Sequence, residues 1–454
     1  MEPISLKKLL AGITDTQDTT PVTEVVTDSR RAGPGCVFAA IRGERVDGHD
    51  FAAKALAAGA AAVIAERPIP GLADGRVYQV ANTRDALIAM AGNYRAAFEP
   101  VLVGITGSVG KTTTKEFCAA VFSAFGPTLK TEGNQNNEIG MPATLFRLTP
   151  QVRYAVVEMG MDHKGDLHKL TGAARPCAAV ITRIGVSHIE NLGSQENILA
   201  AKMEICDGLP DDGLLVVNGD DPRLAAVQPP RRIQKVQFGI ESAAAQVAAC
   251  GIESSAEGER FTIRDAEFGE IAAAIPAVGR HNIYNALAAY TLATRLGLDP
   301  HRAAAALANY RTTGMRQKLS EFGGVRIIED CYNANPDSMR AALEALSTLG
   351  RSGRRVAVLG DMLELGAISD AAHREVGRWA AEVADCLITY GAGGALIAEG
   401  AKEAGAKEVW HCATKREAAE RLRAYCRSGD TVLFKASRGM AFEEILQEYR
   451  GEQA

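Results

Sequence analysis

The sequence predicts an α/β protein of three domains: a small α/β unit, then a mostly parallel sheet with helices, then a Rossmann-like unit. Its 454 residues amount to about three domains of ordinary size. Short apolar runs alternate with segments of helical length along most of the chain, which is the pattern of α/β folds. The pattern changes near residues 98 and 313, so we expect domains at 1–98, 99–313 and 314–454.

The first predicted domain mixes short apolar runs, such as CVFAAIRG and AAVIAE, with turn residues. At residue 99 an apolar run, PVLVGIT, leads through a glycine-rich turn into a helical stretch over 111–125. Further strands are expected at 154–159 and 178–184, separated by segments of helical length. This order predicts a mostly parallel, doubly wound sheet.

Residues 214–276 contain alternating runs (LLVVN, KVQFGI, RFTIRD) that predict a β-rich extension of the central domain. The stretch HNIYNALAAYTLATRLGL has helical spacing and ends at a glycine, and Asn282 stands where a helix cap is favoured. From about residue 314, apolar strands alternate with helical stretches rich in Ala, Glu and Arg. This last segment predicts a second Rossmann-like domain.

Composition and charge exclude several classes of function. The 50 Lys+Arg and 55 Asp+Glu give a net charge of −5, so no overall positive field favours nucleic acid or an anionic membrane. No apolar run approaches the roughly 18 residues of a membrane helix, and the start MEPISLKKLL lacks the apolar core of a signal peptide. We therefore expect a cytoplasmic protein with no membrane insertion, and, because nothing indicates an obligate interface, a monomer.

The most specific local signal is a phosphate-binding loop. The segment GITGSVGKTT over residues 104–113 follows a predicted strand and opens a helix. Backbone amides there can surround phosphate oxygens, with Lys111 on the β- and γ-phosphates and the Thr112 hydroxyl on Mg²⁺. The usual first glycine position of this motif is occupied by Ile105, so the glycines stand at 104, 107 and 110.

Two further residues are candidates for this site. Glu158 ends the predicted strand YAVVE, where phosphate-loop proteins place an acid on or near magnesium; a solvated strand-end carboxylate is the alternative. His188, in GVSHIENLGS, follows the next strand and stands near the edge where ligands bind in such folds. A lone histidine is more often structural, so from the residues alone its role stays open.

The segment TEGNQNNEIG over residues 131–140 is dense in amide side chains. Asn134, Asn136 and Asn137 are neutral ligands suited to sugar or diphosphate oxygens, while an ordinary turn explains the same residue types equally well.

Taken together, these motifs resemble the Mur ligases of bacterial cell-wall synthesis over almost the whole chain. The motifs that carry the resemblance are GITGSVGKTTTKE, TEGNQNNEIGMP, VVEMGMDHKGD, GVSHIENLGS, AAKMEI, VGRHNIYNALAA, EDCYNANPDSM and the N-terminal TDSRRAGPGCVFAAIRGERVDGHDF. The resemblance implies an ATP-dependent amide ligase that adds D-alanyl-D-alanine to UDP-N-acetylmuramoyl-tripeptide through an acyl phosphate. Its implied cofactors are ATP and two Mg²⁺.

The resemblance also implies roles for individual residues. Thr112 would hold the first Mg²⁺, and Glu158 and His188 would hold the second. Lys202, in AAKMEI, corresponds to a family lysine that is carbamylated, and Lys111, Lys202 and His188 are the implied catalytic residues. The remaining implied nucleotide contacts are Gly107, Ser108, Gly110, Thr113, Asn282, Arg316 and Asp330. The remaining implied substrate contacts are Asp28, Ser29, Arg30, Asn333, Asn335, Lys435, Ser437 and Arg438.

Three rival functions remain to be weighed. Folylpolyglutamate synthase shares the ATP chemistry and extends a different acid, but DCYNANPDSM and the Asn-rich segment argue against it. A nucleotide-switch ATPase would not explain the second Rossmann-like domain with its strand-end Asp330. A phosphotransferase would release a stable phosphorylated product, so ADP release that requires both an acid and an amine distinguishes a ligase from the last two.

Overall fold

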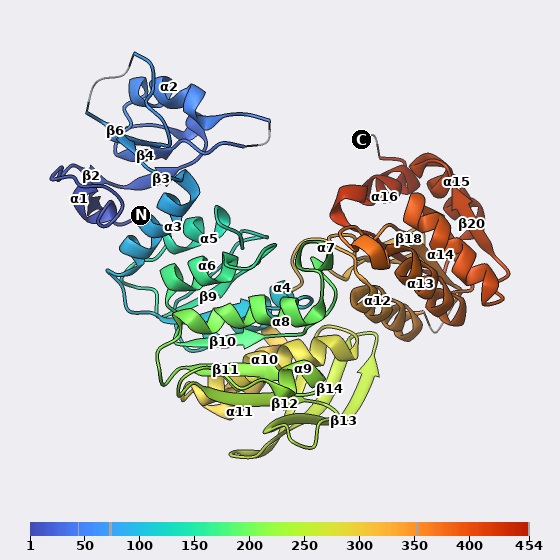
Figure 1. Ribbon diagram of the computed structural model, residues 1–454. Coiled ribbons are helices and arrows are strands. Elements are labelled where there is room, and N and C mark those ends of the chain that lie inside the picture. Colours follow the sequence, from blue (N-terminus) through green and yellow to red (C-terminus); the bar gives the residue numbers. More distant parts are fainter. Residues whose placement is uncertain (44, 72–74, 351–352, 453–454) are drawn as a thin grey trace.

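The chain folds into three lobes around a central sheet, with the first and last lobes standing apart above it (Figure 1). This computed structural model describes all residues except 44, 72–74, 351–352 and 453–454. Within the described residues, no helix combines the length and apolar character needed to cross a membrane. The nine cysteines form no disulfide, and most of them are buried.

The first lobe contains a four-stranded parallel sheet in the order β3-β4-β5-β6 and a two-stranded antiparallel ribbon of β1 and β2. The strands are β1 (Ile4–Ser5), β2 (Pro21–Val22), β3 (Glu24–Val26), β4 (Cys36–Ala39), β5 (Ala62–Ala65) and β6 (Val77–Gln79). The helices are α1 (Leu6–Leu9), η1 (Ser29–Arg31), η2 (Gly48–Phe51), α2 (Ala52–Ala57) and α3 (Thr83–Arg95). The small α/β unit expected from the sequence is confirmed.

The central lobe is built on a nine-stranded sheet in the order β15-β14-β13-β12-β11-β10-β7-β9-β8. All pairings among β7 to β13 are parallel, whereas β14 pairs antiparallel with both β13 and β15. This confirms the mostly parallel sheet with a β-rich extension. The strands are β7 (Val101–Thr106), β8 (Thr128–Lys130), β9 (Tyr154–Glu158), β10 (Ala178–Ile181), β11 (Leu214–Asn218), β12 (Gln234–Gly239), β13 (Val247–Ser255), β14 (Gly258–Asp265) and β15 (Gly269–Ile275).

Helices cover both faces of the parallel part of the central sheet, which explains why β9, β10 and β11 are buried at every position. They are α4 (Lys111–Ser123), α5 (Gly140–Leu145), α6 (Asp166–Ala174), α7 (Ile189–Leu192), α8 (Gln195–Met203), η3 (Glu204–Gly208), α9 (Pro222–Ala226), α10 (Arg280–Arg295), α11 (Pro300–Ala306) and η4 (Leu307–Asn309). In β9, Val156 faces the core shared with α4 and α10, whereas Val157 faces the core shared with α6 and α8. Helix α3 of the first lobe packs in the core that contains α6 and α8, so it joins the first lobe to the central lobe.

The last lobe is a six-stranded sheet in the order β16-β17-β21-β18-β19-β20, parallel except for β16. Its strands are β16 (Lys318–Phe322), β17 (Val325–Glu329), β18 (Arg355–Gly360), β19 (Cys386–Tyr390), β20 (Val409–Cys412) and β21 (Thr431–Lys435). Its helices are α12 (Pro336–Leu349), η5 (Gly366–Ile368), α13 (Ser369–Val383), α14 (Ala392–Glu403), α15 (Lys415–Tyr425), η6 (Arg438–Met440) and α16 (Glu443–Arg450). The expected Rossmann-like unit is confirmed.

Some expected element ends were wrong. Strand β9 stops at Glu158, β10 stops at Ile181 and α4 stops at Ser123. Asn282 is not a helix cap, because α10 begins at Arg280 and Gly279, with φ of 103°, occupies the cap position. A glycine adopts this positive φ without the steric cost that a side chain would meet, so the cap belongs to Gly279.

Candidate active site

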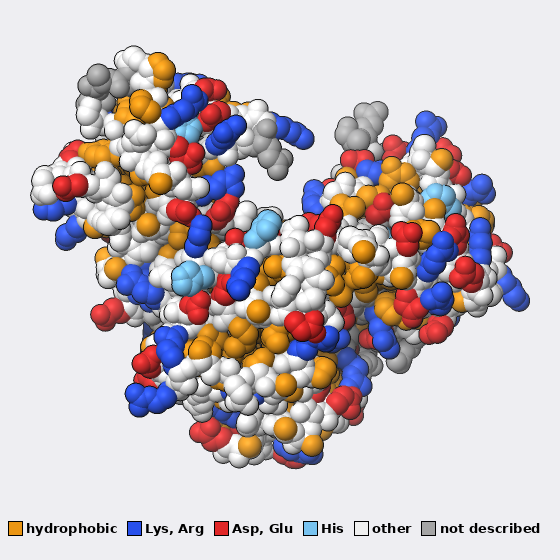
Figure 2. Space-filling view, in the orientation of Figure 1, with side chains coloured by type: hydrophobic (Ala, Val, Ile, Leu, Met, Phe, Trp, Pro, Cys, Tyr) orange, Lys and Arg blue, Asp and Glu red, His pale blue; other side chains and the backbone are white. Residues whose placement is uncertain are grey.

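A cleft of about 1210 Å³ lies where the central and last lobes meet, and Figure 2 shows the molecule hollowed between its lobes. The phosphate loop, the Asn-rich segment and the turn after β17 contribute to its lining. The predicted site residues that line it are Ser108, Gly110, Lys111, Thr112, Thr113, Asn134, Asn136, Asn137, Glu158, His188, Asn282, Arg316, Asp330, Asn333, Asn335 and Lys435. Most residues singled out from separate motifs therefore surround one space.

The phosphate loop joins the end of β7 to the start of α4. Gly107 has a φ of 149° and Gly110 a φ of 88°, which is the region that glycine tolerates best. A Cβ at position 107 would lie 1.9 Å from Thr182 Oγ1, and one at position 110 would lie 2.6 Å from Asn285 Oδ1. Both glycines are therefore required by close neighbours as well as by backbone conformation.

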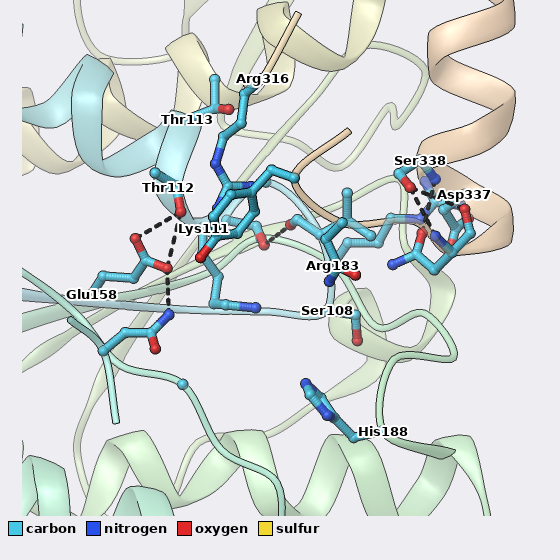
Figure 3. Close-up of a pocket in the computed structure, with 18 of the residues that line it drawn as sticks. Ser108, Lys111, Thr112, Thr113, Glu158, Arg183, His188, Arg316, Asp337 and Ser338 are labelled. Atoms are coloured by element: carbon cyan, nitrogen blue, oxygen red, sulfur yellow. Dashed lines mark hydrogen bonds and ion pairs between the residues drawn. The ribbon is translucent and has the colours of Figure 1, made fainter. Parts of the chain in front are cut away.

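Lys111 begins α4, and its Nζ donates to the carbonyl oxygen of Gly107 at 2.7 Å. Burial lowers the pKa of Lys111, while the nearby carboxylate of Glu158 acts in the opposite direction. This hydrogen bond holds the ammonium against the phosphate loop, and Figure 3 shows Lys111 between Glu158 and His188.

Glu158 ends β9 and is 1% exposed. Its carboxylate accepts hydrogen bonds from Thr112 Oγ1, at 2.9 and 3.1 Å, and from Asn136 Nδ2 at 2.7 Å (Figure 3). The Thr131 hydroxyl accepts from the backbone N–H of Glu158 at 3.0 Å. These contacts join the phosphate loop, the strand-end acid and the Asn-rich segment, and they exclude a merely solvated carboxylate at position 158.

Lys202 lies on α8 and is 1% exposed. Burial, and then the neighbouring charge of Lys111, lowers the pKa of Lys202 well below its usual value. Within the described part of the chain, its ammonium has no hydrogen bond or ion pair, and the residue is not among those that line the cleft. A buried amine of lowered pKa is a better nucleophile than a solvated ammonium, because more of it carries a free electron pair.

His188 immediately precedes α7 and has a φ of 62°. Its Nδ1 lies 2.9 Å from Glu364 Oε2 of the last lobe and 3.2 Å from Asp162 Oδ1, although neither contact has hydrogen-bonding geometry. Figure 3 shows its ring on the opposite side of Lys111 from Glu158. Among the described residues, no three His, Cys, Asp or Glu side chains converge on one metal position.

The turn after β17 supplies the other wall of the cleft. The guanidinium of Arg316 lies 3.9 Å from the centre of the Tyr332 ring. Asn335 caps α12, and its Nδ2 donates to the hydroxyl of Ser187 in the central lobe at 2.7 Å. Asn282, on α10, donates to Gln317 Oε1 at 2.9 Å.

Several predicted residues lie away from the cleft lining. Asp28 caps η1 and pairs with the exposed side chain of Arg30 at 2.6 Å, so local structure accounts for both. Ser437 accepts a hydrogen bond from the backbone N–H of Leu363. The predicted residues outside the lining are Asp28, Ser29, Arg30, Gly107, Lys202, Ser437 and Arg438.

Sequence reasoning missed residues that shape the site from a distance. Thr182 donates to the Val109 carbonyl oxygen at 2.5 Å, and Asn285 accepts from Thr114 at 3.0 Å, so both fix the phosphate loop. The ion pair of Arg183 with Asp337, at 3.1 Å, joins the two lobes. Asn285 follows Asn282 by one helical turn, which is the one signal that would have indicated it.

Comparisons with known proteins identify the family of this chain. A family model described as the Mur ligase middle domain matches residues 105–293, and the Mur ligase glutamate ligase domain matches 315–438. A third model, the Mur ligase family catalytic domain, matches residues 21–95. The chain belongs to the Mur ligase family. It is thus an ATP-dependent ligase that forms C–N bonds, as the sequence predicted.

Relatives within the Mur ligases are similar over nearly their whole length. A UDP-N-acetylmuramoyl-tripeptide–D-alanyl-D-alanine ligase of Bacillus subtilis is 40% identical, covering 93% of this chain and 92% of its own. The enzyme of the same name from Escherichia coli is 38% identical over 93% and 92%. A crystal structure of MurF from Acinetobacter baumannii is similar with a TM-score of 0.90 and 31% identity, each chain being fully covered.

Two further solved structures bear on the rival functions. MurF from Thermotoga maritima, solved in complex with ADP, has a TM-score of 0.85 at 30% identity and covers 94% of this chain and 97% of its own. Mycobacterium tuberculosis folylpolyglutamate synthase has a TM-score of 0.62 at 16% identity, covering 82% and 95%, which shows a shared fold alone. The relatives therefore favour the predicted D-alanyl-D-alanine ligase over the folylpolyglutamate alternative.

Proposed function

We propose that this chain joins D-alanyl-D-alanine to UDP-N-acetylmuramoyl-tripeptide, using ATP, to give the pentapeptide precursor of peptidoglycan. The observation that carries the proposal is the single cleft in which Lys111, the Glu158 cluster and the turn at 330–335 face one another. The 40% identity to a ligase of this name, over nearly both whole chains, supports the choice of substrates.

The proposed reaction has two steps. A carboxylate oxygen of the tripeptide attacks the γ-phosphorus of ATP, ADP leaves, and an acyl phosphate forms. The amine of D-alanyl-D-alanine then attacks the acyl carbon, and inorganic phosphate departs with that carboxylate oxygen as the amine loses a proton. The first step brings two anions within about 3–3.5 Å, so the site needs concentrated positive charge. Lys111 is the residue best placed to supply it, because it begins α4 inside the phosphate loop.

The donors around Glu158 fit a magnesium ion. Mg²⁺ takes oxygen ligands and is held by one or two carboxylates together with substrate phosphates and water. The Thr112 hydroxyl and the Glu158 carboxylate, 2.9 Å apart, would hold it beside the phosphate loop, and Asn136 would orient the carboxylate. Bound there, Mg²⁺ would neutralise charge on the phosphate oxygens. The resemblance assigned Glu158 and His188 together to a second ion, whereas in the structure Glu158 contacts Thr112, and His188 lies beside Asp162 and Glu364. We therefore propose the second ion at His188 without Glu158.

Carbamylation of Lys202 is the second proposed feature. The free amine would attack CO₂ and lose a proton, which gives a carbamate in place of a cation. The lowered pKa of the Lys202 ammonium supports this reaction, since the amine must be neutral to attack. The product would carry negative charge near Lys111, whose ammonium contributes to that lowered pKa.

Contacts between the central and last lobes suit a reaction that must exclude water. The proposed nucleotide contacts Asn282 and Arg316 line the same cleft as the proposed dipeptide contacts Asn333 and Asn335. Closing the lobes on both substrates would bring the amine to the acyl phosphate and limit its hydrolysis. We further propose that Asp28, Ser29 and Arg30 contact the uridine-diphosphate end of the tripeptide substrate. We also propose that the domain boundaries lie at residues 98 and 313.

The deciding experiment follows oxygen atoms. The tripeptide substrate is labelled with ¹⁸O in its terminal carboxylate and incubated with ATP, Mg²⁺ and D-alanyl-D-alanine. We expect one ¹⁸O atom in each phosphate released, and no release when either the acid or the amine is omitted. Unlabelled phosphate, or release that is independent of the amine, would refute the acyl-phosphate route.

A variant identifies the role of the phosphate loop. Lys111→Ala should lower kcat at least about 100-fold, because the charge that offsets the meeting anions is lost. Lys54→Ala, an exposed lysine of α2, is the matched control and should keep full activity. Full activity in Lys111→Ala would contradict the assignment of the loop.

A further inference from the structure

Lys435 is a buried lysine at the end of the central strand β21 of the last lobe. It is 2% exposed, although it reaches the lining of the cleft. Its Nζ donates to the Asp330 carbonyl oxygen at 3.2 Å and to the Asn333 carbonyl oxygen at 2.9 Å, and it forms an ion pair with Asp330 Oδ2 at 2.8 Å. Two of the three N–H donors of the ammonium are therefore bound to backbone oxygens, and its charge is paired with the Asp330 carboxylate.

The three acceptors belong to one turn, residues 330–335, which leaves β17 at the carboxyl edge of the sheet. Strand β21 lies between β17 and β18 and is parallel to both, so its last residue lies at the same edge of the sheet as this turn. Backbone carbonyl groups in such a turn have no strand partner, and Lys435 provides the donors that they need.

This turn carries residues of both proposed binding sites. Asp330, the proposed ribose contact, accepts from the backbone N–H of Gln317 at 3.3 Å, beside Arg316. Asn333, the proposed dipeptide contact, is exposed to the cleft three residues later. One ammonium therefore holds the nucleotide side and the dipeptide side of the turn at a fixed separation.

We propose that Lys435 is a positioning residue that sets the turn at 330–335 for both ATP and the dipeptide, instead of binding the dipeptide carboxylate itself. The inference rests on the proposed ligase function. Moving the ammonium onto a ligand carboxylate would weaken its hydrogen bonds to the two carbonyl oxygens and its ion pair with Asp330, and would release the turn that these contacts hold. Arg438, whose side chain is 53% exposed and pairs with Glu443, is a more solvated candidate for such a carboxylate.

The two roles predict different kinetics, and Lys435→Met separates them because methionine keeps the length of the side chain without its charge or donors. The measurements are KM for ATP, KM for D-alanyl-D-alanine and KM for D-alanyl-D-alaninamide, which lacks the carboxylate. A positioning role predicts that both KM for ATP and KM for the dipeptide rise about 10- to 100-fold, as misplaced binding groups produce. The ratio of KM for the dipeptide to KM for the amide should stay at its wild-type value.

Direct binding of a non-hydrolysable ATP analogue, measured by calorimetry without the other substrates, gives a readout that is independent of turnover. We expect the Kd of Lys435→Met to rise about 10-fold or more. An unchanged Kd for the ATP analogue, together with KM values for the dipeptide and for the amide that become about equal, would overturn the proposal and assign Lys435 to the carboxylate. Unchanged constants throughout would overturn it as well.

Lys435→Gln covers the case in which Lys435→Met does not fold, because glutamine keeps two N–H donors and should give the same changes at smaller size. Lys402→Met, on the exposed surface of α14, is the matched control and should behave as wild type. If the wild-type protein shows no dipeptide-dependent phosphate release, the proposed function fails, while the analogue-binding arm still tests Lys435.

Discussion

The buried amine of Lys202 leads to a prediction about stability and activity together. Lys202 is 1% exposed and its ammonium has no hydrogen bond or ion pair among the described residues, so folding removes it from water with only the more distant charge of Asp162 acting in its favour. Lys202→Met fills nearly the same volume with an apolar group. We expect the free energy of unfolding to rise by about 1–3 kcal/mol, the usual cost of burying an unpaired polar group. The proposed ligase activity should be lost.

The magnitude translates into a measurable shift. One kcal/mol moves the melting temperature of a domain of this size by about 2–4 °C, so Lys202→Met should melt about 2–12 °C higher. Differential scanning calorimetry in buffer free of CO₂ keeps the wild-type amine uncarbamylated. Lys54→Met, at an exposed position of α2, should shift the transition little.

The lowered pKa of Lys202 also predicts how stability depends on pH. Burial lowers the pKa of Lys202 below its unfolded value of 10.5, so the unfolded chain binds this proton more tightly. Wild-type stability therefore rises with pH, and the advantage of Lys202→Met shrinks toward pH 10. A variant that melts lower than wild type at pH 7, or an advantage that grows with pH, would refute the argument.

Three further predictions concern the same region. Gly107→Ala should weaken binding of an ATP analogue about 10-fold or more in calorimetry, because its Cβ would lie 1.9 Å from Thr182 Oγ1. Burial lowers the pKa of His281 to about 4, so unfolding titrations of wild type should show stability falling, by up to about 3 kcal/mol, between pH 6.5 and 4, and His281→Asn should abolish that fall. Arg183→Ala breaks an ion pair with Asp337 whose arginine is 50% exposed; we expect unfolding free energy to change by less than about 0.5 kcal/mol, whereas small-angle scattering should report a wider separation of the lobes.

How far each assignment could be predicted depended on how local its cause is. The strand, loop and helix around Lys111 were predictable because glycine spacing and apolar periodicity act over a few neighbouring residues. The cap at Gly279 was misassigned to Asn282, since side-chain preference indicated asparagine while the backbone required a positive φ. Element ends such as that of β10 were extended too far, because an apolar run continues beyond the last strand hydrogen bond.

The sequence by itself determined the three α/β units, the phosphate loop and the family, because each is written in contiguous motifs. Only the tertiary structure decided that Thr112, Asn136 and Glu158 share one cluster, since 46 and 22 residues separate the first two from the acid. It likewise decided that Lys202 is buried with no hydrogen bond or ion pair to any residue that the structure describes, and that Lys435 turns inward to its own chain. Burial and hydrogen bonding across the fold depend on which elements pack together, and no local pattern records that.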